Sequence, residues 1–452
     1  NEPEEEKHMD AREVALLTLN ACERQGGWSD GVLKKQIAAA GLDSRDAGLA
    51  TQLCFGVIQN RILLDFYLSK FSNIPLRRLE GKVLQALRLG LYQMLFLTRI
   101  PHSAAVDQSV ALTRAHCKNP RAPGMVNAIL RNLERSLDRL PTIPEDDPAE
   151  YYATLYSHPV WLVRELLETL GSEGTAAFLQ ADNSQPPITA MVNTVKTDLE
   201  GALEALQAEG VHGEPHPWLK NCLVLSRSGS LEELDAFQNG LFYVQDPASR
   251  LAVMALDPEP GSRVLDMCAA PGGKSFAAAI QMKDQGEIWS CDLHPHKKTL
   301  IQKGAQRLGL TCIRPQTADG KVRRPEWEGT FDRVLVDAPC SGLGVIRKKP
   351  DIRFKDPEPL SGLPQVQSAI LDNAAGYVKP GGVLVYSTCT ILERENRAVT
   401  DAFLAAHPEF SRERFLLPGP AGEVSEGQIT LWPQVHGTDG FYICKLRKDG
   451  EA

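Results

Sequence analysis

The feature that most constrains the fold of this 452-residue chain is a regular alternation of apolar and amphipathic segments after residue 240. Short apolar runs read as buried strands, and the segments between them carry apolar side chains at helical spacing. The predicted strands are residues 264–267, 288–292, 312–315, 333–337, 382–387 and 441–445, and the predicted helices are a segment from residue 273 and residues 297–308, 365–378 and 393–405. This order predicts a mostly parallel, doubly wound α/β sheet, which binds ligands at the carboxyl ends of its strands.

The segments ahead of this sheet differ in character, so we expect three domains. Residues 10–140 carry apolar side chains at three- and four-residue spacing, which is typical of an all-α bundle. A proline-rich acidic linker at 141–148 leads to residues 150–240, which mix helix and strand patterns as in a small α+β unit. The expected domains are 9–140, 150–240 and 241–448. Residues 1–8 are unlike a folded segment and are excluded, with Met9 as the expected native start.

Charge is distributed unevenly along the chain. The whole chain carries a net charge of −8, but residues 10–140 hold 18 Lys and Arg against 11 Asp and Glu. A basic module in front of an acidic remainder suits the capture of a polyanion such as RNA, although a solvated basic surface gives the same pattern. Arg131 and Asn132, on one predicted helix, are candidates for phosphate contacts or for plain exposure to water.

Composition excludes several classes of protein. With 43% hydrophobic and 23% charged residues the chain is globular, and no apolar run is long enough to span a bilayer. The ten cysteines lack paired spacing, and no CxxC or Cys/His cluster indicates a metal site. Reduced thiols and the lack of a secretory leader indicate a cytoplasmic protein without a membrane or metal partner.

The first predicted strand of the sheet leads into a glycine-rich turn. Residues 266–275 read DMCAAPGGKS, where small residues let backbone N–H groups approach a ligand at the start of a helix. The spacing is neither the GxGxxG of dinucleotide sites nor the GxxxxGK[ST] of phosphate loops. The candidate cofactor-binding residues of this turn are Cys268, Ala269, Ala270, Pro271, Gly272, Gly273 and Lys274.

Acidic residues follow the later strands. Asp292 is placed to accept hydrogen bonds from two ribose hydroxyls, and Asp319 could accept one from an adenine amino group, although each alone is more often a cap or turn residue. Asp337, at the end of another strand, is counted with the candidate cofactor-binding residues as well. Such acids beside a turn without a phosphate motif fit a nucleoside that carries no phosphate, and S-adenosyl-L-methionine is such a ligand.

Two cysteines lie at strand ends in the same predicted sheet. Residues 334–344 read VLVDAPCSGLG, a buried strand that stops at Asp337 and is followed by Cys340, and residues 387–391 read STCTI, which places Cys389 after the strand 382–387. If the two strands are neighbours, both thiols face one pocket beside the cofactor. The pair can be a redox pair, a metal site, or a nucleophile with its helper. The nearby cofactor turn and the lack of close histidines favour the last.

These motifs resemble those of the RNA cytosine-5 methyltransferases, namely CAAPGGK at 268–274, DAPCSG at 337–342 and STCT at 387–390. The strings QLCFG at 52–56 and VNAIL at 126–130 resemble the NusB antitermination factor. In this order the motifs are similar to the bacterial 16S rRNA cytosine-5 methyltransferases of the Fmu/Sun type, which act at cytosine 967. The middle unit fits least well, because Met191 stands where an arginine is expected before the Val-Asn pair.

The resemblance implies an all-α NusB-like bundle, a small α+β middle domain and a C-terminal Rossmann-like methyltransferase domain that depends on S-adenosyl-L-methionine. It implies that Cys389 attacks C6 of cytosine and that Cys340 helps to release the product. Asp337 is expected to hold the N3/N4 edge of the base, and Lys274 to lie near both base and cofactor.

The resemblance also sets the expected partners. These are 16S rRNA or a small-subunit assembly intermediate, bound by a monomer. The basic run RKKPDIR at 347–353 is expected to hold RNA phosphates, although a solvated surface is the alternative. Two other functions stay open, a tRNA cytosine-5 methyltransferase and a non-catalytic rRNA assembly factor. The intact Asp337, Cys340 and Cys389 argue against the second.

Overall fold

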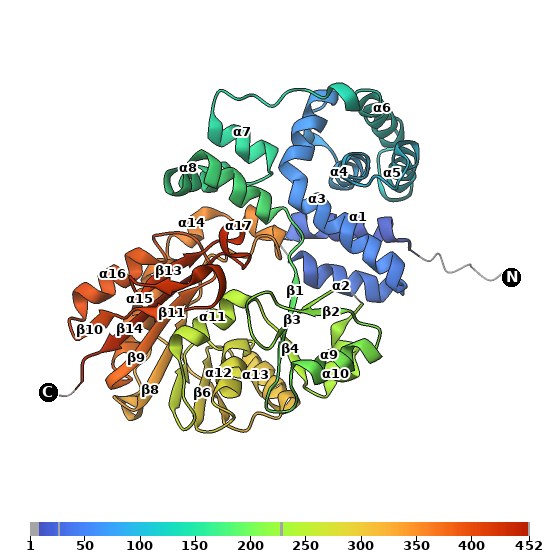
Figure 1. Ribbon diagram of the computed structural model, residues 1–452. Helices are drawn as coiled ribbons and strands as arrows, with labels where there is room; N and C mark the ends of the chain where they lie inside the picture. The colour runs from blue at the N-terminus through green and yellow to red at the C-terminus, as the bar shows by residue number, and fades with distance from the viewer. Residues whose placement is uncertain (1–8, 26–27, 227–228, 451–452) are drawn as a thin grey trace. The chain divides into compact units, whose positions relative to one another are not determined.

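The computed structural model describes residues 9–25, 28–226 and 229–450 (Figure 1). The chain divides into two compact units, Asn1–Asn183 with Lys349–Lys355 and Ser184–Lys348 with Asp356–Ala452. The expectation for residues 1–8 lies outside the described residues, and the three domain limits given above stay a prediction.

The first unit is helical throughout its described residues, as the apolar spacing predicts. Its helices are α1 (Ala11–Gln25), α2 (Ser29–Ala40), α3 (Ser44–Phe71), α4 (Gly81–Phe96), α5 (His102–His116), α6 (Ala122–Glu134), α7 (Pro148–Leu155) and α8 (Val160–Asp182), with 3-10 turns η1 (Leu76–Arg78), η2 (Leu137–Arg139) and η5 (Pro350–Phe354). Helix α4 is central, because every residue from Val83 to Met94 is buried. Its buried Arg88 is compensated by Asp65 at 2.7 Å and Glu23 at 2.8 Å.

Arg131 on α6 does not offer a free positive charge. Its guanidinium donates to Asp107 at 2.6 Å and to Glu134 at 2.9 Å, so its charge is compensated by two acids of the same bundle. A phosphate contact through Arg131 would have to compete with these two acids, and it stays a prediction. Asn132 is exposed, which fits both alternatives.

The second unit begins with a small antiparallel sheet of order β2-β3-β1-β4, as expected for an α+β unit. Its elements are β1 (Ile188–Val192), α9 (Leu199–Ala208), β2 (Gly213–Pro215), β3 (Cys222–Leu225), η3 (Leu231–Glu233), α10 (Asp235–Gln238) and β4 (Phe242–Val244). The buried Asn193 amide donates to the carbonyls of Gly240 and Leu308, which ties this sheet to the helix layer of the larger sheet. Met191 is 3% exposed and packs in the shared core, so this position holds a core side chain in the present protein.

The larger sheet has the order β10-β14-β9-β8-β5-β6-β7, with β13 paired to β14. Its strands are β5 (Arg263–Asp266), β6 (Glu287–Asp292), β7 (Ile313–Thr317), β8 (Phe331–Asp337), β9 (Val378–Thr388), β10 (Phe410–Arg412), β13 (Gln428–Leu431) and β14 (Phe441–Lys448), and β11 (Phe415–Leu416) and β12 (Glu423–Val424) form a separate pair. Strands β5 to β9 are parallel, and β10, β13 and β14 are antiparallel additions at one edge. The predicted mostly parallel sheet is confirmed.

Helices cover both faces of this sheet (Figure 1). Helices α11 (Pro247–Leu256), α12 (Gly273–Gln281) and α13 (Pro295–Leu308) share one apolar core with it, and α15 (Leu363–Ala375) and α16 (Arg397–Ala406) share the core of the other face. The short elements η4 (Pro325–Trp327), α14 (Pro357–Leu360), η6 (Gly419–Ala421) and α17 (Pro433–His436) lie in the connections. This is the doubly wound arrangement expected from the sequence.

Two predicted helices have the wrong limits. The helix predicted at 365–378 ends at Ala375, and Val378 already belongs to β9. The helix predicted from residue 393 begins only at Arg397. Glu395 and Asn396 instead turn inward, where Asn396 accepts a hydrogen bond from Thr388 and donates to the carbonyl of Thr390. Apolar spacing could not reveal these tertiary contacts.

Candidate active site

The two cysteines come together at the carboxyl ends of neighbouring strands. Strand β8 pairs in parallel with β9, and Asp337 lies opposite Ser387 where both strands end. Cys340 follows β8 and Cys389 follows β9, and their Sγ atoms are 3.3 Å apart. The two strands are thus neighbours and the two thiols meet, whereas a shared pocket beside the cofactor stays a prediction. All ten cysteines of the chain are free.

The two thiols are not equivalent. The hydrogen bond from Cys340 lowers the pKa of Cys389, and the ammonium of Lys274 lowers it further, against burial and the charges of Asp337 and Asp439. The same hydrogen bond raises the pKa of Cys340, as do its burial and the charge of Glu395. Cys389 is thus the thiol that ionises first, and Cys340 keeps its proton.

Lys274 and Asp337 form an ion pair beside the thiols. Lys274 Nζ donates to Asp337 Oδ2 at 2.7 Å, and Ser387 Oγ donates to Asp337 Oδ1 at 2.8 Å. Burial alone would lower the pKa of Lys274, but the Asp337 carboxylate outweighs it and raises that pKa. Lys274 therefore stays an ammonium at neutral pH, and the pair keeps some access to water, with 15% and 23% of the two side chains exposed.

The glycine-rich segment forms the connection between β5 and α12. Cys268, Ala269, Ala270, Pro271 and Gly272 form the turn, and Gly273 and Lys274 open the helix. The turn is anchored to the next strand, because Ala269 N donates to Cys291 O at 2.7 Å. Gly272 has φ +117, and a Cβ there would lie 2.6 Å from the Phe276 ring, so this position requires glycine. The N-cap residue of α12 is Gly272, which has no side chain to cap the helix, and ligand binding at this helix start stays a prediction.

Acidic side chains line the same edge of the sheet. Asp266 is buried at the end of β5, where burial raises its pKa to about 7 and its Oδ1 has no hydrogen-bond partner among the described residues. Asp292 ends β6 and accepts from His294 N at 3.1 Å, and Asp319 follows β7 and accepts from Lys321 N at 2.9 Å. Both thus act as turn residues through one carboxylate oxygen. Their other oxygens accept no hydrogen bond from the described part of the chain.

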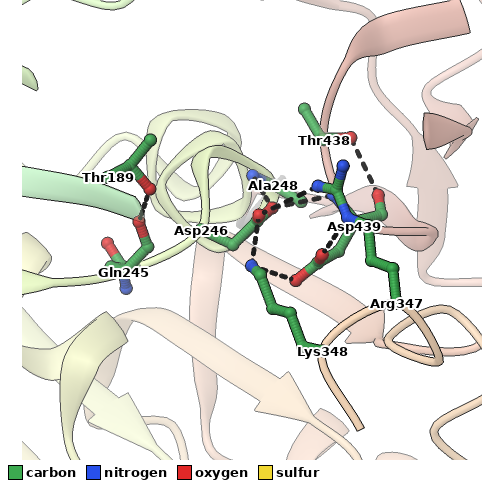
Figure 2. Close-up of polar contacts among 8 residues, drawn as sticks. All are labelled: Thr189, Gln245, Asp246, Ala248, Arg347, Lys348, Thr438 and Asp439. Carbon is green, nitrogen blue, oxygen red and sulfur yellow. Dashed lines mark hydrogen bonds and ion pairs between the residues drawn. The ribbon is translucent and has the colours of Figure 1, made fainter. Parts of the chain in front are cut away.

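The basic run after Cys340 does not form a free phosphate-holding loop. Arg347 and Lys348 are paired with Asp246 and Asp439 (Figure 2). Arg353 is 1% exposed and donates to backbone carbonyls of the first unit. The expectation is therefore wrong for these three side chains, and of the cations in this run only Lys349 is exposed.

Sequence reasoning missed Glu395, a buried acid behind the thiols. Its carboxylate accepts from Ser341 N at 2.9 Å and from Ser341 Oγ at 2.6 Å, and it also accepts from Gln367 Nε2 at 3.0 Å. It therefore fixes the residue that follows Cys340. Glu395 lies in a charged run, ERENR, that reads as an exposed helix start, so no local signal marks it.

Replacing Lys274 with methionine should raise the pH at which Cys389 becomes reactive, because the ammonium that lowers the pKa of Cys389 is lost. The pH dependence of iodoacetamide alkylation, read by mass spectrometry on the peptide that contains Cys389, measures this midpoint. Lys379→Met is the matched control, since Lys379 pairs with Asp332 and not with the thiols. An unchanged midpoint in Lys274→Met would show that Lys274 does not lower the pKa of Cys389.

Further observations restrict the kind of site. The described residues contain no group of three or more His, Cys, Asp or Glu side chains suited to a metal ion. No helix in the described ranges is both long and apolar enough to cross a membrane.

Comparison with known proteins finds similarity over nearly the whole chain. Residues 253–447 match the family described as 16S rRNA methyltransferase RsmB/F, residues 9–135 match the NusB family, and residues 158–232 match the RsmF/B-like ferredoxin-like domain. The probable ribosomal RNA small subunit methyltransferase B of Bacillus subtilis is 40% identical, over 98% of this chain and all of that protein. The ribosomal RNA small subunit methyltransferase B of Klebsiella pneumoniae is 32% identical, over 98% of this chain and 99% of the relative.

Solved structures agree with this relationship. The crystal structure of PH0851 has a TM-score of 0.79 at 26% identity, covering 97% of this chain and 99% of that one. A methyltransferase homologue from Pyrococcus horikoshii has a TM-score of 0.55 at 28% identity, covering 66% of this chain and 97% of that one. With its NusB-like helical domain, ferredoxin-like middle domain and methyltransferase sheet, the chain belongs to the ribosomal RNA small subunit methyltransferase B family, of the Fmu/Sun type.

Proposed function

We propose that the protein transfers a methyl group from S-adenosyl-L-methionine to C5 of one cytosine in 16S rRNA, at position 967, through a covalent bond between Cys389 and C6 of the base. The observation that carries this proposal is the pair of unlike thiols 3.3 Å apart, with Lys274 and Asp337 beside them. A half-buried thiol of lowered pKa beside a thiol of raised pKa suits a nucleophile with a neighbouring group that handles a proton.

The chemistry explains why a thiolate is needed. C5 of cytosine is not nucleophilic enough to take a methyl group unaided. Attack of the Cys389 thiolate on C6 makes C5 enamine-like. C5 then bonds to the methyl carbon as the bond from that carbon to the sulfonium sulfur breaks, which leaves S-adenosyl-L-homocysteine. Once Cys389 is bonded to C6, its hydrogen bond and its charge no longer raise the pKa of Cys340. Cys340 can then ionise and take the C5 proton, and cleavage of the bond between C6 and Sγ returns the Cys389 thiolate and releases 5-methylcytosine.

Asp337 and Lys274 are proposed to hold the base. A carboxylate oxygen has more than one acceptor direction, so Asp337 can accept from the N3/N4 edge of cytosine while it still pairs with Lys274. A proton on N3 develops favourably beside this carboxylate as the adduct forms. Because the site lies at strand ends inside the protein, the target base must leave its stack to reach it.

The residues present fit S-adenosyl-L-methionine. The open start of α12 offers backbone N–H groups, Asp292 retains an oxygen for ribose hydroxyls, and Asp319 retains one for an amino group. When bound, this cofactor supplies a methyl group on a sulfonium, which is a good leaving group. Asp266 Oδ1 is buried and has no hydrogen-bond partner among the described residues, so Asp266 is a further candidate for a contact with the cofactor.

RNA is the proposed partner. The basic stretch 10–140 belongs to a NusB-like domain, and such a surface captures a polyanion electrostatically. The substrate is proposed to be naked 16S rRNA or a small-subunit assembly intermediate, bound by a monomer in the cytoplasm. Binding is expected to weaken as salt increases, because phosphate contacts release counterions.

The proposal is tested by incubating the protein with methyl-labelled S-adenosyl-L-methionine and 16S rRNA. We expect label in 5-methylcytosine of the rRNA and none in tRNA added to the same reaction. Label in tRNA alone would favour a tRNA cytosine-5 methyltransferase. No label in rRNA, either naked or in small-subunit precursors, would favour a non-catalytic assembly factor.

A further inference from the structure

Four charged side chains, Asp246, Arg347, Lys348 and Asp439, form a buried ionic cluster (Figure 2). Arg347 Nε donates to Asp439 Oδ1 at 3.0 Å, and Lys348 Nζ donates to Asp246 Oδ1 at 2.6 Å and to Asp439 Oδ2 at 2.8 Å. No more than 9% of the side chain is exposed in either acid or in Arg347, and 30% in Lys348. Two positive and two negative charges balance in this cluster.

The cluster joins three segments that are far apart in the sequence. Asp246 caps α11 by accepting from Ala248 N at 2.9 Å, and its same oxygen accepts from Asp439 N at 3.0 Å. Arg347 and Lys348 end the loop that begins after Cys340. Asp439 lies two residues before the start of β14. The cluster is therefore a cross-link between a helix start, the thiol loop and an edge of the sheet.

Backbone hydrogen bonds connect these segments to Cys389. Gly344 N donates to Cys389 O at 2.9 Å, and Gly440 N donates to Gly344 O at 2.8 Å. A Cβ on Gly344 would lie 1.9 Å from Gly440 O and 2.8 Å from Cys389 O. The Cys389 carbonyl, Gly344 and Gly440 are thus packed too closely for any side chain between them. Asp439 is the neighbour of Gly440, so the ionic cluster fixes the backbone at Gly440, which is hydrogen-bonded to Gly344.

Other roles explain the cluster less well. A buried ionic group is a weak source of stability, because the cost of removing the charges from water offsets their attraction. Both cations are compensated by acids and Arg347 is only 5% exposed, so the cluster offers an RNA phosphate little accessible positive charge. What distinguishes the cluster is its place, two backbone hydrogen bonds away from the proposed nucleophile.

We propose that Asp246, Arg347, Lys348 and Asp439 are positioning residues for Cys389. The ionic cluster holds the Gly344 and Gly440 backbone against the Cys389 carbonyl, and so fixes the thiol relative to the base and to the cofactor. The inference rests on the proposed function, because it takes Cys389 as the nucleophile.

Changing a charge of the cluster should shift the pH at which Cys389 is alkylated, and a merely structural role would not cause such a shift. The groups that face Cys389 are Cys340 and Asp337 from β8 and its loop, Lys274 from α12, and Asp439 from the segment before β14. Among them, Asp439 raises the pKa of Cys389.

Lys348 and Arg347 compensate the charge of Asp439. Removing the acid should therefore lower the pH at which Cys389 is alkylated, and removing the lysine should raise it. Removing both should bring the midpoint back towards that of the unchanged protein.

The test compares Asp439→Asn, Lys348→Met, the double variant and the conservative Lys348→Arg. In each, kcat and KM for methyl transfer to 16S rRNA are measured, together with the pH midpoint of Cys389 alkylation. We expect kcat to fall on the order of 100-fold in Asp439→Asn and Lys348→Met, the loss that a misplacement of ~1 Å causes, while KM for RNA stays nearly unchanged. The two midpoints should move in opposite directions, and Lys348→Arg should retain most activity.

Asp332→Asn is the matched control, since Asp332 pairs with Lys379 at 3.1 Å and is not part of the site. Thermal unfolding of each variant separates loss of fold from loss of positioning. Unmoved alkylation midpoints in both folded single variants, or a loss confined to KM for RNA, would overturn the inference. Failure of the proposed function is distinct, because the unchanged protein would then transfer no label while the alkylation midpoints could still be compared.

Discussion

Replacing Cys389 with alanine is expected to reduce methyl transfer to 16S rRNA by at least about 10⁴-fold, because the thiol proposed to form the bond to C6 is lost. Cys389 is the thiol whose pKa is lowered, by the hydrogen bond from Cys340. The measurement is the rate of label transfer from S-adenosyl-L-methionine to rRNA. The variant should also form no covalent complex with the RNA.

The control for this variant is Cys444→Ala, a change at a buried free cysteine of β14 on the other face of the sheet. It should retain methyl transfer if it folds, since its thiol lies in the apolar core away from the strand ends. Cofactor binding by Cys389→Ala, measured by calorimetry, should stay close to that of the unchanged protein. Substantial methyl transfer by Cys389→Ala would show that Cys389 is not the nucleophile.

Replacing Cys340 with alanine is expected to trap the protein on its RNA. Attack by Cys389 can still occur, but the thiol proposed to take the C5 proton from the adduct is lost, so product release should slow roughly 10²–10⁴-fold. A covalent protein–RNA complex should accumulate and survive denaturing electrophoresis. Its formation should require both S-adenosyl-L-methionine and a cytosine at the target position.

The Cys340 variant also decides between the two cysteines. If Cys340→Ala formed no adduct while Cys389→Ala did, the roles of the thiols would be reversed. The double variant Cys340→Ala/Cys389→Ala should form no adduct under either assignment, and it therefore serves as the blank. Loss of the acidifying hydrogen bond should also move Cys389 alkylation to higher pH in Cys340→Ala.

The sheet was largely predictable because its strands are buried on both faces. Strands β8 and β9 contain the buried apolar runs 334–336 and 383–386, and such runs mark strands that are covered on both faces. The predicted limits of a helix are wrong where buried side-chain contacts determine where that helix begins. Glu395 and Asn396 have a helical pattern in the sequence, but their buried hydrogen bonds to Ser341 and Thr390 delay the helix until Arg397.

The two thiols could be identified from the sequence, but their difference could not. Their adjacency follows from the pairing of β8 with β9, which the order of strands suggests. Which thiol ionises depends first on the hydrogen bond between the two thiols, and then on burial and on nearby charges such as Lys274 and Glu395, which are distant in sequence. From the motif alone, the role of Cys389 rested on resemblance.

The basic loop shows why local charge is a poor guide. RKKPDIR reads as a phosphate-binding segment because its own stretch has few acids. Its compensating acids, Asp246 and Asp439, are about a hundred residues away in either direction and meet Arg347 and Lys348 only in the fold. A long-range ion pair of this kind leaves no local pattern.

Bisulfite sequencing of 16S rRNA, from cells with and without this protein, tests the central claim most directly. The account predicts one cytosine, at position 967, that resists conversion in cells that contain the protein and converts in cells that lack it. Restoring the protein should restore resistance, whereas restoring Cys389→Ala should not. A 16S rRNA whose conversion pattern is the same with and without the protein would contradict the account.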